Sequence, residues 1–168
     1  KLKELPLVRY FDIGSREWTN AETWPPKGKD VQYYLHSGGQ ANTRFGNGTL
    51  LLDSPGIQCP DSYQYDPLDP VPTKGGRIQM PEVQEAGVKD QSAVEEREDV
   101  LVYTTKHLDK AVKIAGPVEA KLFISSSAVD TDFTAKLVDV EPDGYCISVF
   151  EFLSHLGKLL DEISNLIL

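Results

Sequence analysis

The chain has 168 residues, of which 40% are hydrophobic and 26% charged, enough apolar mass for one domain with a packed core. Acidic residues outnumber basic ones 26 to 17, and the formal net charge of -9 would repel a phosphate backbone, which argues against a nucleic-acid partner. No apolar run approaches the ~18 residues that cross a bilayer, and the first residues lack the apolar stretch of a secretory signal. We therefore expect a soluble cytoplasmic domain without a membrane partner.

The first part of the chain, to about residue 148, consists of short β-prone runs separated by clusters of Gly, Pro, Asp and Ser. This pattern is typical of an all-β sandwich or barrel. The predicted strands cover residues 7–13, 31–36, 49–52, 100–105, 112–114, 119–125 and 133–140. The clearest signal is the apolar alternation over residues 118–124, which predicts a strand with one buried face.

A tight turn is predicted at Asn47-Gly48, between Arg44-Phe45 and Thr49-Leu50-Leu51. Asn-Gly readily adopts the positive φ angles of a type I′ hairpin. With Thr49, the same residues form an acceptor sequence for N-glycosylation. Because no secretory signal is visible, the turn is the favoured interpretation.

Residues 53–98 differ from the rest, since they are rich in Pro, Asp, Gly and Gln around the segment 65–72. Such a composition predicts a long loop without a regular element. Loops of this length in a compact domain are usually functional loops, docking surfaces or disordered linkers. The Tyr and Pro content favours an ordered loop that lies against another surface.

The last segment, residues 149–168, has apolar residues at alternating spacings of four and three, which predicts an amphipathic helix. They are Val149, Leu153, Leu156, Leu160, Ile163 and Ile167. Such a stripe could cover an open sheet face or pair with a second copy of the chain. The sequence thus favours a homo-oligomer joined through this helix.

Catalytic and metal-binding patterns are weak. The Gly-x-Ser-x-Gly motif of α/β-hydrolases is absent, and the serines at 125–127 are expected to satisfy backbone groups. Asp130 and Asp132 could form half of an acid/base pair or a calcium site, but a turn is favoured. Calcium binding by the loop carboxylates is disfavoured by their irregular spacing; these are Asp53, Asp61, Asp66 and Asp69.

The two cysteines, Cys59 and Cys146, lack the spacing of a zinc site and are expected to be free thiols. We expect no catalytic residue, cofactor or metal in this chain. Aromatic residues are concentrated in its first 65 positions, where core or inter-domain packing is favoured over a sugar-stacking platform. They include Trp18, Trp24, Tyr33, Tyr34, Tyr63 and Tyr65.

Several motifs follow one another in a recognisable order. The first group comprises residues 11–18, Thr23-Trp24-Pro25-Pro26, Tyr33-Tyr34-Leu35, Asp61-Ser62-Tyr63, Tyr65-Asp66-Pro67 and Pro70-Val71-Pro72-Thr73. The second comprises Asp99-Val100-Leu101-Val102-Tyr103, Gly116-Pro117-Val118, Asp130-Thr131-Asp132-Phe133 and Pro142-Asp143-Gly144. Over residues 7–145 the chain resembles the C-terminal domain of the Xaa-Pro dipeptidyl-peptidase and cocaine esterase family of serine hydrolases.

The resemblance implies a jelly-roll β-sandwich of the galactose-binding-like type. In this family the catalytic triad belongs to a preceding α/β-hydrolase domain, so the chain is expected to be a non-catalytic part that docks on that domain and helps to shape its substrate cleft. Enzymatic activity would belong to the parent family and not to this chain. The expected docking residues are Trp18, Trp24, Tyr63, Tyr65, Asp66 and Pro67.

The chain departs from the family pattern after residue 144, where further strands would complete the sandwich. We therefore expect an incomplete jelly roll over residues 1–148 followed by the helical tail, as in a separate subunit, a split-gene product or a frameshifted remnant. Two other functions remain open. The alternative to a docking domain is a free-standing carbohydrate- or ligand-binding module, and an independent enzyme using an unrecognised carboxylate pair is the least favoured.

Overall fold

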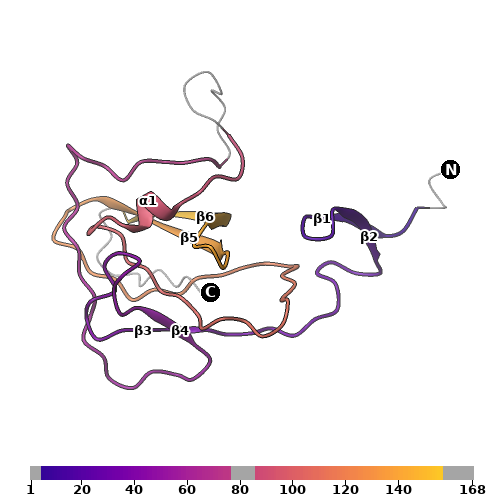
Figure 1. Cartoon of the computed structure of the whole chain (residues 1–168), viewed down its shortest axis with the longest axis horizontal. Helices are drawn as coiled ribbons and strands as arrows, with labels where there is room; N and C mark the ends of the chain where they lie inside the picture. The colour runs from indigo at the N-terminus through magenta and orange to yellow at the C-terminus, as the bar shows by residue number, and fades with distance from the viewer. Residues whose placement is uncertain (1–4, 77–85, 157–168) are drawn as a thin grey trace.

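The computed structural model describes residues 5–76 and 86–156 (Figure 1). Within these ranges, six strands form three two-stranded antiparallel sheets. Strand β1 (Val8–Asp12) pairs with β2 (Glu17–Ala21), β3 (Tyr34–His36) with β4 (Thr49–Leu51), and β5 (Thr131–Val140) with β6 (Cys146–Leu156). The described helix is a single turn, α1 (Ser92–Glu95), at the end of the predicted long loop. The all-β class is confirmed, whereas the jelly-roll arrangement stays a prediction.

The β1–β2 hairpin is built around Asp12. Its Oδ1 atom accepts hydrogen bonds from the backbone N–H groups of Gly14 (3.0 Å) and Ser15 (3.2 Å), and Arg16 adopts a left-handed conformation with φ 57°. The Asp12 side chain therefore closes the turn between β1 and β2. The predicted strand at 7–13 is confirmed as β1, but β2 was not predicted.

Figure 1 shows this hairpin standing apart from the rest of the molecule, at the end of an extended connection. A second segment reaches it from the body of the chain. The ammonium group of Lys113 forms an ion pair with Asp12 and lies 5.5 Å from the centre of the Tyr10 ring. Because a two-stranded hairpin alone is marginally stable in water, these contacts help to hold it.

The turn predicted at Asn47-Gly48 is wrong, because neither residue has a positive φ and β4 pairs with β3 instead. The chain reverses at Thr43, which adopts φ 62° and accepts a hydrogen bond from the N–H of Gly46. Gly48 is needed for another reason. A Cβ atom there would lie 2.0 Å from the carbonyl oxygen of Val102, so only glycine lets the two backbones approach.

The β5–β6 ladder corrects the helix predicted from residue 149. Residues 149–156 belong to β6, which pairs with β5 from Val140↔Cys146 to Thr131↔Leu156, with an irregularity between Leu137 and Val138. Val149, Phe150 and Phe152, at the start of this segment, are residue types that favour strands, and a long partner strand supplies backbone hydrogen bonds. The remainder of the predicted helix, residues 157–168, lies outside the described residues.

Three other predicted strands are not assigned as strands. Residues 100–105 make only isolated bridges, Asn42↔Leu101 and Thr49↔Thr104, and residues 112–114 are irregular. In the segment 118–124, side-chain burial alternates as predicted, with Ala120 fully buried, but the backbone has no ladder partner among the described residues. The apolar alternation in this segment therefore predicted which side chains are buried, but not the backbone hydrogen bonding.

The hydrophobic core is small. Among the described residues, the buried hydrophobic side chains are Ala41, Val94, Ala120 and Cys146. The fully buried Gln91 lies beside them and donates to the carbonyl oxygens of Lys74 and Lys89. The chain has an accessible surface of 13683 Å², whereas a compact protein of its mass, 18.6 kDa, exposes about 8200 Å².

Candidate docking surface

The aromatic residues predicted to dock lie mostly exposed. On the hairpin, Trp18 is 59% exposed and packs edge-on against Phe11, with ring centres 5.6 Å apart. The guanidinium of Arg9 lies 5.0 Å from the centre of the Trp18 ring. Trp24, 55% exposed, contacts the edge of Tyr10. The hairpin and the segment that follows it thus carry two pairs of aromatic rings, with the Arg9 guanidinium beside Trp18.

The second group of predicted residues lies on an irregular segment, residues 61–69, which we call the arch. Its first end is fixed by the carboxylate of Asp61. This group accepts hydrogen bonds from the Ser37 hydroxyl (2.5 Å), the Tyr103 hydroxyl (2.7 Å) and the Ala41 N–H (2.9 Å). Although partial burial raises the pKa of Asp61, the three hydrogen bonds outweigh it and hold the pKa below its usual value.

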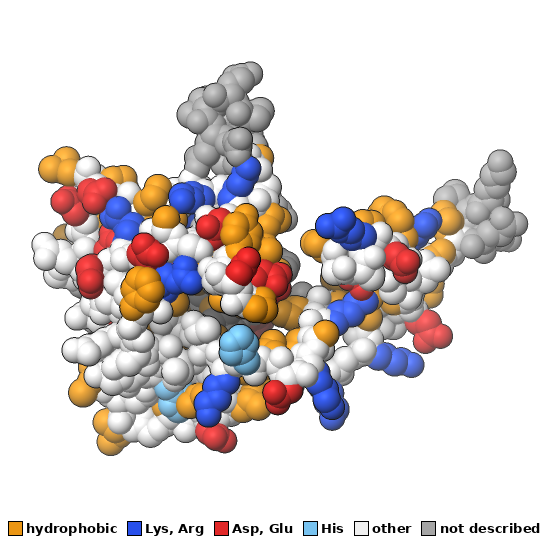
Figure 2. All heavy atoms as spheres, in the orientation of Figure 1, with side chains coloured by type: hydrophobic (Ala, Val, Ile, Leu, Met, Phe, Trp, Pro, Cys, Tyr) orange, Lys and Arg blue, Asp and Glu red, His pale blue; other side chains and the backbone are white. Residues whose placement is uncertain are grey.

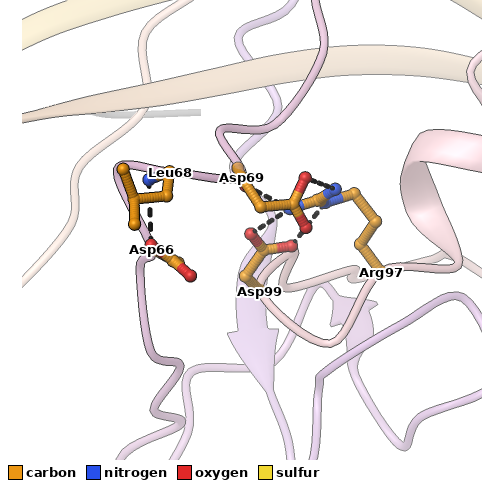
Figure 3. A network of polar contacts seen from close by, with 5 residues as sticks. All are labelled: Asp66, Leu68, Asp69, Arg97 and Asp99. Atoms are coloured by element: carbon orange, nitrogen blue, oxygen red, sulfur yellow. Dashed lines mark hydrogen bonds and ion pairs between the residues drawn. The ribbon is translucent and has the colours of Figure 1, made fainter.

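The second end of the arch is fixed by Arg97, just after α1 (Figure 3). Two guanidinium nitrogens, Nε and Nη2, each donate to one carboxylate oxygen of Asp99 at 2.8 Å. The same group donates to the carbonyl oxygen of Asp69 (2.7 Å) and to its side chain (3.3 Å). These hydrogen bonds lower the pKa of the Asp99 carboxyl and raise that of Arg97. The fork geometry ties the loop to the segment that follows the helix.

Between the two anchors lies the tip of the arch, formed by Tyr65, Asp66 and Leu68, which is exposed. Asp66 closes it, because its Oδ1 atom accepts the Leu68 N–H (2.9 Å) and its carbonyl oxygen accepts the Asp69 N–H (3.1 Å). Tyr65 is 54% exposed and Leu68 is 92% exposed. Tyr63 is more enclosed, and burial together with the charge of Asp99 raises the pKa of its hydroxyl. The arch therefore presents apolar groups on an ordered loop.

The structure does not bring all the predicted residues together. Trp18 belongs to β2 of the hairpin, which stands at one end of the molecule in Figure 1, and Trp24 lies three residues after β2. Tyr63, Tyr65, Asp66 and Pro67 belong to the arch, much further along the chain. Figure 2 shows hydrophobic side chains on both parts, interleaved with charged ones. Sequence reasoning missed Leu68 and both anchors. The sequence does show an Arg-x-Asp pair at residues 97–99, but this pair alone does not predict that Arg97 also binds Asp69, 28 residues away.

Several of the candidate catalytic and metal residues take part in hydrogen bonds within this chain. Ser126 accepts the Ala128 N–H at 3.0 Å, as expected for a serine at the end of an extended segment. Asp61 and Asp69 are engaged by the contacts described above. Within residues 5–76 and 86–156, no group of three His, Cys, Asp or Glu side chains is placed to hold a metal ion. Cys59 is exposed and Cys146 buried, both as free thiols, and burial raises the pKa of Cys146.

Residues 1–159 match the family described as the X-Pro dipeptidyl-peptidase C-terminal non-catalytic domain. The chain belongs to this family. Over 149 residues it is 46% identical to the cocaine esterase of Rhodococcus sp. (strain MB1 Bresler). The matched region covers 88% of this chain and 26% of the esterase. Over 143 residues it is also 29% identical to a Mycobacterium bovis protein described as a putative serine esterase. That matched region covers 83% of this chain and 21% of the Mycobacterium protein.

The chain thus spans about a quarter of the length of the curated relatives that it matches. Its family is defined as non-catalytic, and the relatives are serine hydrolases. No helix in the described ranges is long and apolar enough to span a membrane.

Proposed function

We propose that this chain is an accessory domain that docks on the α/β-hydrolase domain of a serine hydrolase and helps to shape its substrate cleft. The observation that supports this most directly is the excess of exposed surface. About 5500 Å² more is accessible than on a compact protein of the same mass, and the described buried core is correspondingly small. A standard protein interface removes about 800 Å² from each partner, so the excess is ample for a docking surface.

The chemistry of that surface agrees with a protein partner. The exposed side chains include two tryptophans, Trp18 and Trp24, and the tyrosines of the arch. Aromatic residues and arginine are enriched at interface cores, where their large area is buried at low entropic cost. Because the family is non-catalytic, we assign the hydrolytic chemistry to the partner domain.

The test uses the Rhodococcus cocaine esterase from which the segment matching this chain has been removed. The full chain is titrated into that truncated esterase, and binding is measured by calorimetry and by the thermal midpoint of the truncated enzyme. We expect a complex and a raised midpoint, because a partner that binds the folded state stabilises it. The control is an α/β-hydrolase of another family. Binding to both proteins, or to neither, would refute the proposal.

A second candidate function is ligand binding, and one observation favours it. A shallow hollow of about 480 Å³ is lined by polar groups of Gln40, Asn47 and Glu98 beside Phe45, whose side chain is 77% exposed. Planar amides, a carboxylate and an aromatic ring are the groups that bind sugars. A thermal-shift screen against mono- and disaccharides tests this function, since a sugar bound to the folded state would raise the midpoint.

A further inference from the structure

We infer that the arch, residues 61–69, is the recognition element of the docking surface. Its tip, formed by Tyr65, Asp66 and Leu68, inserts into an apolar recess with a basic rim on the hydrolase domain, and Arg97 is the positioning residue that holds the tip. The inference rests on the proposed docking function and names the part of the surface that carries it.

The first argument is the placement of apolar area. The side chain of Leu68 is 92% exposed and that of Tyr65 is 54% exposed, although both lie on a loop ordered by hydrogen bonds. Such side chains contribute little burial to the fold of this chain. Their apolar area is removed from water only when another surface covers the tip.

The second argument is preorganisation. Asp61 fixes one end of the arch through three hydrogen bonds, and Arg97 fixes the other end through Asp69. Asp66 shapes the tip between them by accepting the N–H of Leu68. A loop that is already held in one conformation loses less entropy on binding than a free loop does, so the tip is suited to insertion.

The third argument is charge, which sets the chemistry of the partner. No Lys or Arg occurs between residues 58 and 73. The carboxylates of Asp61 and Asp69 are engaged by donors of this chain, while the Oδ2 atom of Asp66 has no partner among the described residues. The tip therefore presents one carboxylate between two apolar side chains. An apolar recess with Arg or Lys at its rim complements that pattern.

Arg97 positions the tip without belonging to it. The guanidinium reaches Asp99 and Asp69 at the same time, which only a planar group with several fixed N–H donors can do (Figure 3). Lysine at this position would keep the positive charge but could not donate the paired hydrogen bonds to Asp99 while also binding Asp69. We therefore expect Arg97→Lys to loosen the arch while the rest of the fold stays intact.

The experiment measures binding of full-length variants to the truncated Rhodococcus cocaine esterase. We expect the double variant Tyr65→Ser with Leu68→Ser to bind at least ~30-fold more weakly, the loss typical of interface hot spots. Asp66→Asn keeps an oxygen that can accept the Leu68 N–H, so it should weaken binding about 5-fold and reduce the dependence on salt. The control, Phe123→Ser, removes a side chain 80% exposed outside the arch and should change affinity less than about 2-fold.

Arg97→Lys is tested with two readouts. Hydrogen exchange should become faster in residues 62–68, and affinity should fall about 10-fold, while the thermal midpoint of the free chain changes little. A fall in midpoint with unchanged affinity would instead assign Arg97 a purely structural role and overturn this part. If the wild type binds and the tip variants match Phe123→Ser, the arch is not the recognition element, although docking stands. If the wild type does not bind, the proposed function fails and the inference fails with it.

Discussion

Removing the carboxylate of Asp61 tests whether polar anchors, more than apolar packing, hold this domain. Asp61→Ala deletes the acceptor for Ser37, Ala41 and Tyr103. A hydrogen bond to a charged group contributes about 1.5–3 kcal/mol. Because the three bonds share one carboxylate and are not additive, we expect the free energy of unfolding to fall by about 3–4 kcal/mol. This is a large part of the ~5–15 kcal/mol that stabilises a typical domain.

The assay is urea unfolding followed by tryptophan fluorescence, with the thermal midpoint as a second measurement. For a chain of this length, the expected loss corresponds to a midpoint lower by roughly 6–16 °C. Asp61→Asn keeps one acceptor oxygen without the charge and should fall between the wild type and Asp61→Ala. The control is Asp53→Ala, since Asp53 is an exposed aspartate whose backbone carbonyl, not its side chain, accepts a hydrogen bond from His36. If the free energies of unfolding of Asp61→Ala and Asp53→Ala differ by less than about 0.5 kcal/mol, the Asp61 carboxylate contributes no more than a surface carboxylate and our reasoning is refuted.

Three further predictions address the alkaline range, the hairpin and catalysis. Burial and the hydrogen bond to Asp61 raise the pKa of Tyr103, so above pH ~10 the unfolded chain loses this proton before the folded chain does. The free energy of unfolding should therefore decrease as the pH rises past about 10, and Tyr103→Phe should flatten that slope in urea titrations at pH 8–11. Lys113→Met removes the ion pair with Asp12, and hydrogen exchange should accelerate in the hairpin but not in the β5–β6 ladder; equal acceleration in both would contradict a local role. The isolated chain should not hydrolyse p-nitrophenyl esters above a buffer blank, and turnover abolished by a serine-directed phosphonate would overturn the assignment of catalysis to the partner.

The sequence predicted local features better than long-range ones. Strands β1, β3, β4 and β5 were expected because each lies in a β-prone run bounded by turn-forming residues. Strand β2 lacks apolar alternation and exists because it pairs with β1, as Phe11↔Trp18 illustrates. The apolar spacing from Val149 fits a helix, but pairing with β5 decides the conformation of residues 149–156. The apolar spacing of residues 149–167 alone does not show that the preceding strand β5 offers its backbone as a partner.

The candidate docking residues on the arch were proposed from the family resemblance and from the Tyr and Pro content of the loop, but the way they are held was not predicted. The anchor between Asp61 and Tyr103 joins residues 42 positions apart, and the one between Arg97 and Asp69 joins residues 28 apart. Aspartates in a Pro-rich loop indicate turns at the level of the sequence. Only the fold shows that Asp66 forms a local turn while Asp61 and Asp69 bind distant donors.

The small core has a consequence for the heat capacity of the domain. The positive heat-capacity change on unfolding arises mainly from newly hydrated apolar surface, and typical proteins gain about 12–15 cal/mol/K per residue. A chain that buries few apolar side chains and exposes 13683 Å² has much of that surface hydrated before it unfolds. Its stability should therefore vary only gently with temperature. Under the proposed docking, part of the negative heat-capacity change that normally accompanies folding would appear on binding to the hydrolase domain, so that assembly carries the calorimetric signature of core formation.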